Sequence, residues 1–388
     1  MRFIVTRGAK VMRRNRPAAE AYGYAATYDR LEENSMRTKG MALLVSITLV
    51  IVTFVTVIQT LPPSPLPANV PASEFSAERA IRHIQVIAEQ PRPTGTSAYE
   101  AAADYVLARL VEMGLETETQ RSQGSRNTIG WIKGDGSSDI VLLTAHLDSA
   151  PEGPGATDDA SGVAVLLETA RALMSGAPLH NTVMFLFTDA EESGSLGAQA
   201  FINDYPMART VRIVIGFDAG GISGPDGPSA TSANNGWLIR QLAQAENSHI
   251  LGNSAIIALA VTHADFTNAF KEAGFSGYAF SLYWDPRIHT PEDNIENLNP
   301  SSIQDQGYHA LSLARRFGEL DPLGDPGEPD AVFFSVLRLL VVTYPPTWAI
   351  PLAVAVTGIS CSVLVYGLNK RPLLWRGLAT AGSSYWWG

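Results

Sequence analysis

The apolar residues form an uncharged run near each end of the chain and a repeating pattern between these runs. Residues 41–61 are apolar and uncharged over about the 20 residues that a helix needs to cross a membrane. Residues 348–368 form a second run of sufficient length. From about residue 73, helix-like and strand-like patterns alternate, which is typical of a sheet covered by helices. The pattern therefore predicts an α/β domain between two transmembrane helices.

Within the central region, continuous apolar runs predict strands that are buried on both faces. These runs are residues 141–145, 183–187 and 211–217. Helical spacing of apolar residues predicts the main helices at 77–89, 98–113, 163–175, 237–247 and 301–317. We place the domain at residues 75–321, because turn-forming residues follow Asp321.

The segments that flank the domain differ in composition. Residues 62–74 are rich in proline, which predicts a stiff linker. Residues 331–345 are apolar but short, and they contain Arg338, which favours an interfacial helix in the plane of the membrane over a further span. Residues 369–388 are either a tail or the beginning of a further span that does not complete.

The charge distribution predicts the orientation of the chain. Residues 1–40 hold nine Lys/Arg and four acidic residues, although the whole chain has a net charge of -10. Positive charge concentrates on the cytoplasmic side of membrane proteins, so we expect both ends of the chain there and the domain on the extracytoplasmic side. A cleaved signal peptide is the competing interpretation of residues 41–61, but the run is long and lies far from Met1. The acidic central region argues against nucleic acid as a partner.

Cysteine has no expected role in the chemistry of the domain. Cys361 is the only cysteine, and it lies in the second apolar run. An intrachain disulfide is therefore excluded, and a thiolate nucleophile is not expected.

Acidic and histidine residues follow each of the predicted buried strands. His146 follows the first strand, Glu191 and Glu192 follow the second, and Asp218 follows the third. In open α/β sheets, ligands bind outside the carboxyl ends of the strands. We therefore expect these side chains to lie close together.

Asp158 and His289 extend this set of polar residues. Asp158 and Asp159 lie in a glycine-rich loop before a predicted helix, where an aspartate serves either as an N-cap or as a dedicated carboxylate. His289 lies in a polar loop before the last helix of the domain, and His263 competes with it for the same role.

Two imidazoles and three carboxylates are the ligands that two zinc-like ions need when one carboxylate is shared. The candidate ligands are His146, Asp158, Glu192, Asp218 and His289. Glu191 is then a free carboxylate beside the ligands and a candidate general base. Asp148, two residues after His146, is expected to orient that imidazole.

The motifs around these residues resemble the co-catalytic zinc aminopeptidase family in chain order and local sequence over roughly residues 75–320. They are His146-Leu-Asp148-Ser, Pro154-Gly-Ala-Thr-Asp158-Asp-Ala-Ser-Gly, Asp189-Ala-Glu191-Glu192-Ser-Gly, Phe217-Asp218 and His289-Thr-Pro-Glu-Asp-Asn. The leading apolar run makes the chain similar to the membrane-bound branch, with its endoplasmic reticulum metallopeptidase and vacuolar membrane protease types. The resemblance implies a mixed, mostly parallel central sheet with helices on both faces.

The resemblance also implies roles for the residues. Asp158 would bridge two zinc ions, with another divalent metal as the alternative at either position. His146 and Asp218 would complete one metal site, Glu192 and His289 would complete the other, and the matching general base is Glu191.

One position departs from the family. Ile288 stands where many relatives have a tyrosine that stabilises the oxyanion, so Tyr283 or another group would have to replace it.

The expected activity is removal of N-terminal residues from a peptide substrate. A carboxypeptidase of the same fold would need a basic residue such as Arg240, Lys271 or Arg287 to hold a terminal carboxylate. A glutaminyl cyclase would use one zinc ion, and a non-catalytic membrane receptor would have lost ligands. The sequence indicates neither the oligomeric state nor which peptide is cut.

Overall fold

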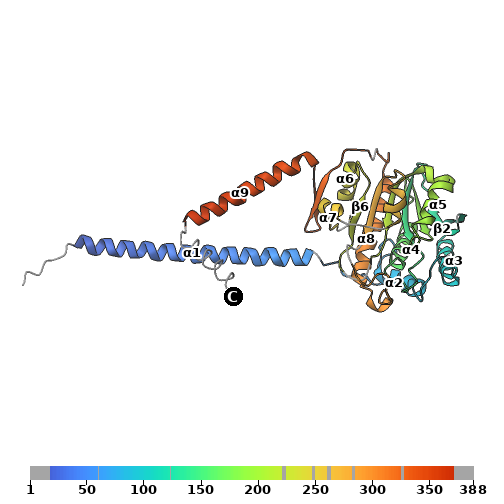
Figure 1. Ribbon diagram of the computed structural model, residues 1–388, viewed down its shortest axis with the longest axis horizontal. Coiled ribbons are helices and arrows are strands. Elements are labelled where there is room, and N and C mark those ends of the chain that lie inside the picture. Colours follow the sequence, from blue (N-terminus) through green and yellow to red (C-terminus); the bar gives the residue numbers. More distant parts are fainter. Residues whose placement is uncertain are drawn as a thin grey trace, which may run out of the picture. The chain divides into compact units, whose positions relative to one another are not determined.

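The computed structural model describes residues 18–370 except residues 60, 123, 221–223, 247–249, 260–263, 282–284 and 325–326. The chain divides into a first unit that ends at Ile58 and a second unit that begins at Gln59. Figure 1 labels some of the helices and strands of both units.

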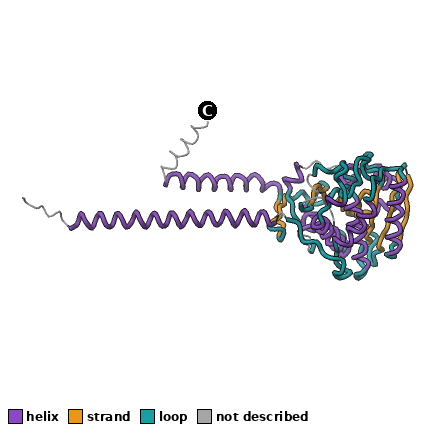
Figure 2. The backbone as a smooth tube through the Cα atoms, turned by 90° about the horizontal axis from the view of Figure 1, so that it is seen from below, coloured by secondary structure: helices purple, strands orange, loops and turns teal. Residues whose placement is uncertain are grey.

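The described part of the first unit is helical. Helix α1 (Ala18–Gln59) is continuous, as Figure 2 shows, and it contains the candidate membrane span Lys39–Ile58 of 20 residues. The helix ends shortly before Pro62, because proline cannot continue a helix and disfavours the helical conformation in the residue before it. The helix therefore includes most of the predicted span 41–61 and extends upstream of it.

A second candidate span lies at the end of the second unit. Helix α9 (Ala349–Lys370) follows a short 3-10 turn at Pro346–Trp348, and the span covers Pro346–Gly367. The described residues thus contain two helices long and apolar enough to cross a membrane. This agrees with the predicted spans at 41–61 and 348–368.

The domain is built on a seven-stranded sheet with the order β1-β2-β4-β3-β5-β7-β6. Strands β4, β3, β5 and β7 run parallel in the centre, and antiparallel pairs form both edges. The predicted mixed sheet is confirmed. The strands are β1 (Glu116–Ser122), β2 (Ser125–Ile132), β3 (Ile140–His146), β4 (Thr182–Thr188), β5 (Val211–Phe217), β6 (Gly227–Thr231) and β7 (Gly277–Ser281).

Helices pack on both faces of the sheet. The helices of the domain are α2 (Ala77–Ile87), α3 (Ser97–Glu112), α4 (Ala160–Met174), α5 (Leu196–Asp204), α6 (Gly236–Gln244), α7 (Ser254–Leu259) and α8 (Pro300–Glu319). A π-helical turn at Phe266–Phe270 and short 3-10 turns at Pro206–Thr210 and Ile295–Asn297 lie between them. Five of the helices, α2, α3, α4, α6 and α8, correspond to predicted segments, whereas α5 and α7 were not predicted.

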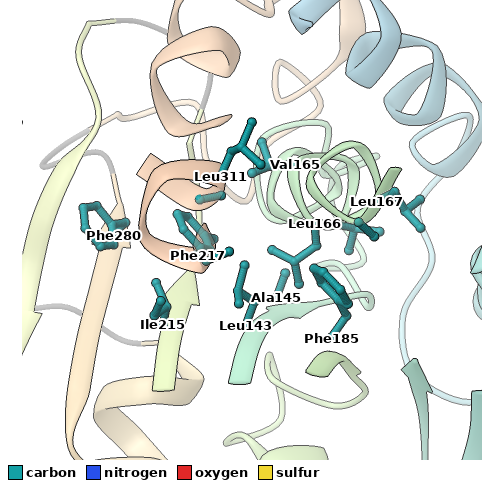
Figure 3. Packing of buried hydrophobic residues seen from close by; sticks show 14 of the residues in the cluster. Leu143, Ala145, Val165, Leu166, Leu167, Phe185, Ile215, Phe217, Phe280 and Leu311 are labelled. Atoms are coloured by element: carbon teal, nitrogen blue, oxygen red, sulfur yellow. The ribbon is translucent and has the colours of Figure 1, made fainter. Parts of the chain in front are cut away.

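The central strands are apolar along their whole length because both of their faces are covered. Alternate residues of β3 belong to different cores: Leu143 packs in the larger cluster, whereas Leu142 packs in the smaller one. Figure 3 shows the larger cluster, where Leu143 and Phe185 of the sheet pack against Leu166 of α4. Burial of this kind contributes roughly 25 cal/mol per Å² of apolar surface.

The register of the parallel strands brings their carboxyl ends to one edge of the sheet. His146 at the end of β3 pairs with Thr188 at the end of β4. Phe217 at the end of β5 pairs with Phe280 of β7. The candidate ligands that follow these strands therefore begin from neighbouring positions.

The proline-rich linker contains neither helix nor strand, as predicted, and it is attached to the domain from Leu66 onward. The Gln304 side chain of α8 accepts a hydrogen bond from the Leu66 backbone N–H at 2.9 Å. Arg171 of α4 donates to the Ala72 carbonyl at 2.6 Å. The linker therefore joins the domain before α2 begins.

The predicted interfacial helix at 331–345 was wrong. This segment forms a two-stranded antiparallel hairpin of β8 (Val332–Val336) and β9 (Leu340–Tyr344). The turn places Leu337 and Arg338 at φ values of 55° and 57°, in the left-handed region that hairpin turns require. Asparagine and glycine usually occupy such positions, so the sequence lacks the ordinary hairpin signal.

Candidate metal centre

Asp158 lies between the two histidines of the candidate site. Its Oδ1 atom is 2.9 Å from Nε2 of His146, and its Oδ2 atom is 2.9 Å from Nε2 of His289. Each imidazole also faces a second carboxylate. Nε2 of His146 is 3.8 Å from Oδ1 of Asp218, and Nε2 of His289 is 3.1 Å from Oε2 of Glu192.

These residues form two groups of potential metal ligands. His146, Asp158 and Asp218 make one group, and Asp158, Glu192 and His289 make the other. Within each group, the ligand atoms lie within 4.8 Å of one another. The five residues proposed from the sequence therefore come together, with Asp158 in both groups.

Asp158 and Asp159 have different roles: Asp159 caps a helix, whereas Asp158 belongs to the candidate ligands. Asp159 is the N-cap of α4, where its Oδ1 accepts from the Gly162 N–H at 2.8 Å. Its Oδ2 accepts from the His146 N–H at 3.2 Å. The Asp158 carboxylate therefore does not cap α4, and Asp159 connects the start of α4 to the end of β3.

The loop that contains His289 also holds the loop that contains Asp158. The Asp293 carboxylate accepts from the backbone N–H groups of Thr157 at 2.7 Å and Asp158 at 3.1 Å. The two loops approach closely at Gly153, where an added Cβ would meet the Thr290 carbonyl oxygen at 2.1 Å. Glycine is required there because any side chain would separate the loops.

Asp148 holds the turn after β4. Its two carboxylate oxygens accept from the N–H groups of Glu191 at 3.1 Å and Glu192 at 3.2 Å. Its backbone carbonyl lies 3.2 Å from Nδ1 of His146, whereas its carboxylate is 3.5 Å from the same nitrogen. An Nδ1–H donated to this carbonyl leaves the Nε2 lone pair of His146 directed at the carboxylates, as a metal ligand requires.

Glu192 is oriented in a comparable way. Its Oε1 accepts from the Ala150 N–H at 3.1 Å, which turns Oε2 toward His289. The neighbouring Glu191 accepts through Oε1 from the Ser195 hydroxyl at 3.2 Å. The carboxylates of the adjacent glutamates therefore have separate hydrogen-bond partners, although both backbone N–H groups donate to Asp148.

Arg92 is a buried basic residue that the sequence analysis missed. Its guanidinium donates to the carbonyls of Leu147 at 2.6 Å and Gly155 at 3.1 Å, and it also contacts the Pro154 carbonyl. These carbonyls lie on both sides of the turn between His146 and Asp158. Arg92 therefore fixes the path of this loop, although no motif marks it.

Asp265 is a further buried carboxyl that the sequence analysis left without a role. It accepts a hydrogen bond from the Thr188 hydroxyl at the end of β4. Burial raises the pKa of Asp265 to about 6. Asp265 therefore adds to the concentration of acid groups at this edge of the sheet.

The electrostatics of the cluster are those of crowded acids around two imidazoles. Burial acts to raise the pKa of Asp158, but hydrogen bonds with His146 and His289 hold it below the ordinary value. The hydrogen bond with Asp158 raises the pKa of His289 to about 9. His289 is also the most accessible candidate ligand, with 55% of its side chain exposed.

The pKa values of the two glutamates are raised, in contrast to that of Asp158. Burial raises the pKa of Glu191 to about 9 and that of Glu192 to about 7, and nearby carboxylates add to both shifts. Burial also raises the pKa of Asp218. Crowded carboxyls of this kind ionise together only when cations balance them. The donor set therefore fits divalent metal ions.

Several backbone positions at the site are strained. Ala190, Ala219 and His289 have φ values of 57°, 46° and 60°, which non-glycine residues rarely adopt. Ala190 precedes the glutamate pair, Ala219 follows Asp218, and His289 is itself a candidate ligand. Strain of this kind concentrates at functional sites.

Some residues considered in the sequence analysis do not enter this geometry. His263 and Tyr283 lie outside the described residues. Arg287 is bound by Asp285, with guanidinium-to-carboxylate distances of 2.9 and 2.7 Å, and Arg240 pairs with Glu328.

The comparison with protein families agrees with this site. Residues 127–314 match the model of peptidase family M28. Residues 127–314 form a peptidase family M28 domain. Because the matched segment includes all five candidate ligands, the prediction of a metallopeptidase domain is confirmed at the level of the family.

Curated relatives of the chain carry names that refer to the endoplasmic reticulum or to the vacuolar membrane. The chain is 29% identical to endoplasmic reticulum metallopeptidase 1 of Mus musculus, over 70% of this chain and 34% of that protein. It is also 29% identical to the vacuolar membrane protease of Candida albicans (strain WO-1), over 67% of this chain and 32% of that protein. The chain spans about a third of the length of these relatives.

Solved structures share the fold of the M28 domain. A zinc aminopeptidase from Bacillus subtilis superposes with a TM-score of 0.54 at 17% identity, covering 66% of this chain and 98% of that chain. Porphyromonas gingivalis glutaminyl cyclase superposes with a TM-score of 0.52 at 21% identity, covering 62% of this chain and 97% of that chain. Because peptidases and a cyclase share the architecture, the fold alone does not assign the reaction.

Proposed function

We propose that this protein is a membrane-anchored aminopeptidase whose M28 domain binds two zinc ions. The observation that supports this proposal best is the position of Asp158, whose two oxygens face different histidines in two ligand groups. A carboxylate in this position is suited to bridge two ions. His146 and Asp218 complete one site, and Glu192 and His289 complete the other.

The chemistry combines the metal ions with a base from the chain. Bound zinc ions would supply Lewis-acid activation of water and polarisation of the scissile carbonyl. Glu191 accepts the proton of the attacking water on its carboxylate and returns it to the leaving amine. Asp148 holds the Glu191 backbone, so the base is presented from a fixed turn.

Removal of N-terminal residues is favoured by the charge of the site. Its carboxylates suit a substrate ammonium group, whereas a carboxypeptidase needs a basic residue for the terminal carboxylate. Of the candidates for that role, Arg287 and Arg240 already pair with acidic side chains. A glutaminyl cyclase would need only one of the two ligand groups.

The membrane orientation is part of the proposal. The basic residues before the first span favour a cytoplasmic N-terminus. Two spans then return the chain to the same side and leave the M28 domain on the extracytoplasmic side. The peptide substrate would be found there.

The test uses the full chain in detergent or nanodiscs with zinc. Wild type should release the first residue from a peptide with a free N-terminus, should not cut its N-acetylated form, and should tolerate an amidated C-terminus. Glu191→Gln should retain its metal and lose activity by about 10²-fold or more. Glu152→Gln, on an exposed residue of the same region, is the matched control. Wild-type activity in Glu191→Gln would reject the proposed base.

A further inference from the structure

The β8–β9 hairpin has one face that belongs to the domain. Phe333 is buried in the larger core cluster, and Val341 packs against it. The backbone of Ser335 donates to the Gly252 carbonyl at 3.0 Å, and its hydroxyl accepts from the Gly252 N–H at 3.1 Å. The hairpin is therefore a fixed part of the domain.

The opposite face and the tip of the hairpin are apolar and exposed. Cross-strand pairing places Phe334 opposite Val342 and Val336 opposite Leu340, which forms a continuous apolar surface. Leu339 at the tip is 82% exposed, and Leu340 is 59% exposed. An exposed apolar patch of this kind marks a surface that contacts another phase or partner.

The one charged residue of the segment 331–348 is directed away from this surface. Arg338 occupies the turn, but its guanidinium forms an ion pair with Asp305 of α8, and both side chains are buried. The outward surface therefore lacks a charged group that would keep it in water. An arginine turned outward would be expected if the tip faced solvent.

The segment that follows the hairpin along the chain indicates what covers the exposed apolar face. Strand β9 ends at Tyr344, and the second candidate span begins at Pro346. One intervening residue reaches only about 7 Å at roughly 3.5 Å per residue, so the end of β9 lies close to the start of the candidate span. Trp348, exposed at the start of the span, is a residue type that concentrates at membrane interfaces.

We propose that the outer face of the β8–β9 hairpin lies in the interfacial region of the lipid bilayer. Leu337, Leu339 and Leu340 enter the boundary between headgroups and acyl chains, as the apolar face of an interfacial helix would. The pair between Arg338 and Asp305 holds the tip in this orientation. The hairpin thus fixes the M28 domain against the membrane instead of leaving it on a flexible tether.

The experiment places an environment-sensitive fluorophore on the hairpin. In the full chain with Cys361→Ser, a single cysteine is introduced by Leu339→Cys, labelled with a nitrobenzoxadiazole dye and reconstituted in phosphatidylcholine nanodiscs. The matched control is Val111→Cys, an exposed apolar residue on α3 of the same domain. The Leu339→Cys label should emit at shorter wavelength and be quenched by lipids with a nitroxide near the headgroup, whereas the control label should do neither.

Two results would overturn the proposal. Emission and quenching at Leu339→Cys equal to those of the control would place the tip in water. A blue-shifted emission without quenching by nitroxide lipids would place it against protein, such as a second copy of the chain. Both substitutions lie on exposed side chains, so neither variant is expected to disturb folding.

Discussion

The Asp293 carboxylate accepts a hydrogen bond from the backbone N–H of Asp158 at 3.1 Å. Asp293 follows His289 in the same loop, so one segment supplies a candidate ligand and also holds the backbone of the shared one. The loops that carry His289 and Asp158 are therefore joined by a hydrogen bond to Asp293, which is not itself a candidate ligand.

Replacement of Asp293 by alanine should weaken metal binding. The backbone N–H groups of Thr157 and Asp158 lose their acceptor, and loss of such supporting contacts typically costs 10- to 100-fold in metal affinity, so a loss of about that size is expected. Competition with a chelator measures the affinity. Glu292→Ala, on the exposed neighbour of Asp293, should leave it unchanged. Equal affinities of the two variants would show that Asp293 does not position the site.

Asp148→Asn should impair catalysis while the domain remains folded. An amide nitrogen cannot accept from Glu191 or Glu192, so one of the two N–H groups loses its partner. The turn that presents the proposed base becomes less well fixed, and we expect kcat to fall by about 10- to 100-fold. Steady-state kinetics and the melting temperature should be measured together. A variant with normal kcat would contradict the positioning role, and the exposed Asp135→Asn is the control.

His83 should make the stability of the domain depend on pH. Burial lowers the pKa of His83 from 6.5 to about 4, and Nδ1 lies 2.7 Å from the Tyr105 hydroxyl. Between these values the unfolded chain binds more protons than the folded chain, so stability is lost as the pH falls from about 6.5 toward 4. The loss should be on the order of 1 to 2 kcal/mol, since the ring is partly exposed.

The comparison of wild type with His83→Gln isolates this effect from the titration of the acids. The melting temperature of wild type should fall further between pH 7 and pH 4.5 than that of the variant. Parallel curves for the two proteins would mean that His83 does not titrate differently on folding.

The sequence was sufficient for the parts of the fold that follow regular patterns. The runs at 141–145, 183–187 and 211–217 are strands because continuous apolar sequence suits strands buried on both faces. Parallel strands bring their carboxyl ends to one edge, which explains why His146 and Asp218 could be expected to meet. The structure brings both residues into one ligand group.

The parts that could not be predicted depend on contacts without a local pattern. Arg92 and Asp293 act through hydrogen bonds to the backbone of distant loops, and any sequence can supply such partners. The β8–β9 hairpin was missed because Leu337 and Arg338 adopt left-handed conformations that their side chains do not favour. Core contacts of Phe333 and the ion pair of Arg338 supply the tertiary contacts that compensate for this strain.

The number of metal ions per chain tests the central claim most directly. Full-length protein is loaded with zinc, dialysed, and measured by plasma mass spectrometry as wild type, Asp158→Asn and His289→Gln. Because Asp158 belongs to both ligand groups and His289 to one, wild type should hold two ions, His289→Gln one, and Asp158→Asn fewer than His289→Gln. One ion in wild type, or equal metal contents in the two variants, would contradict a shared carboxylate at the centre of the site.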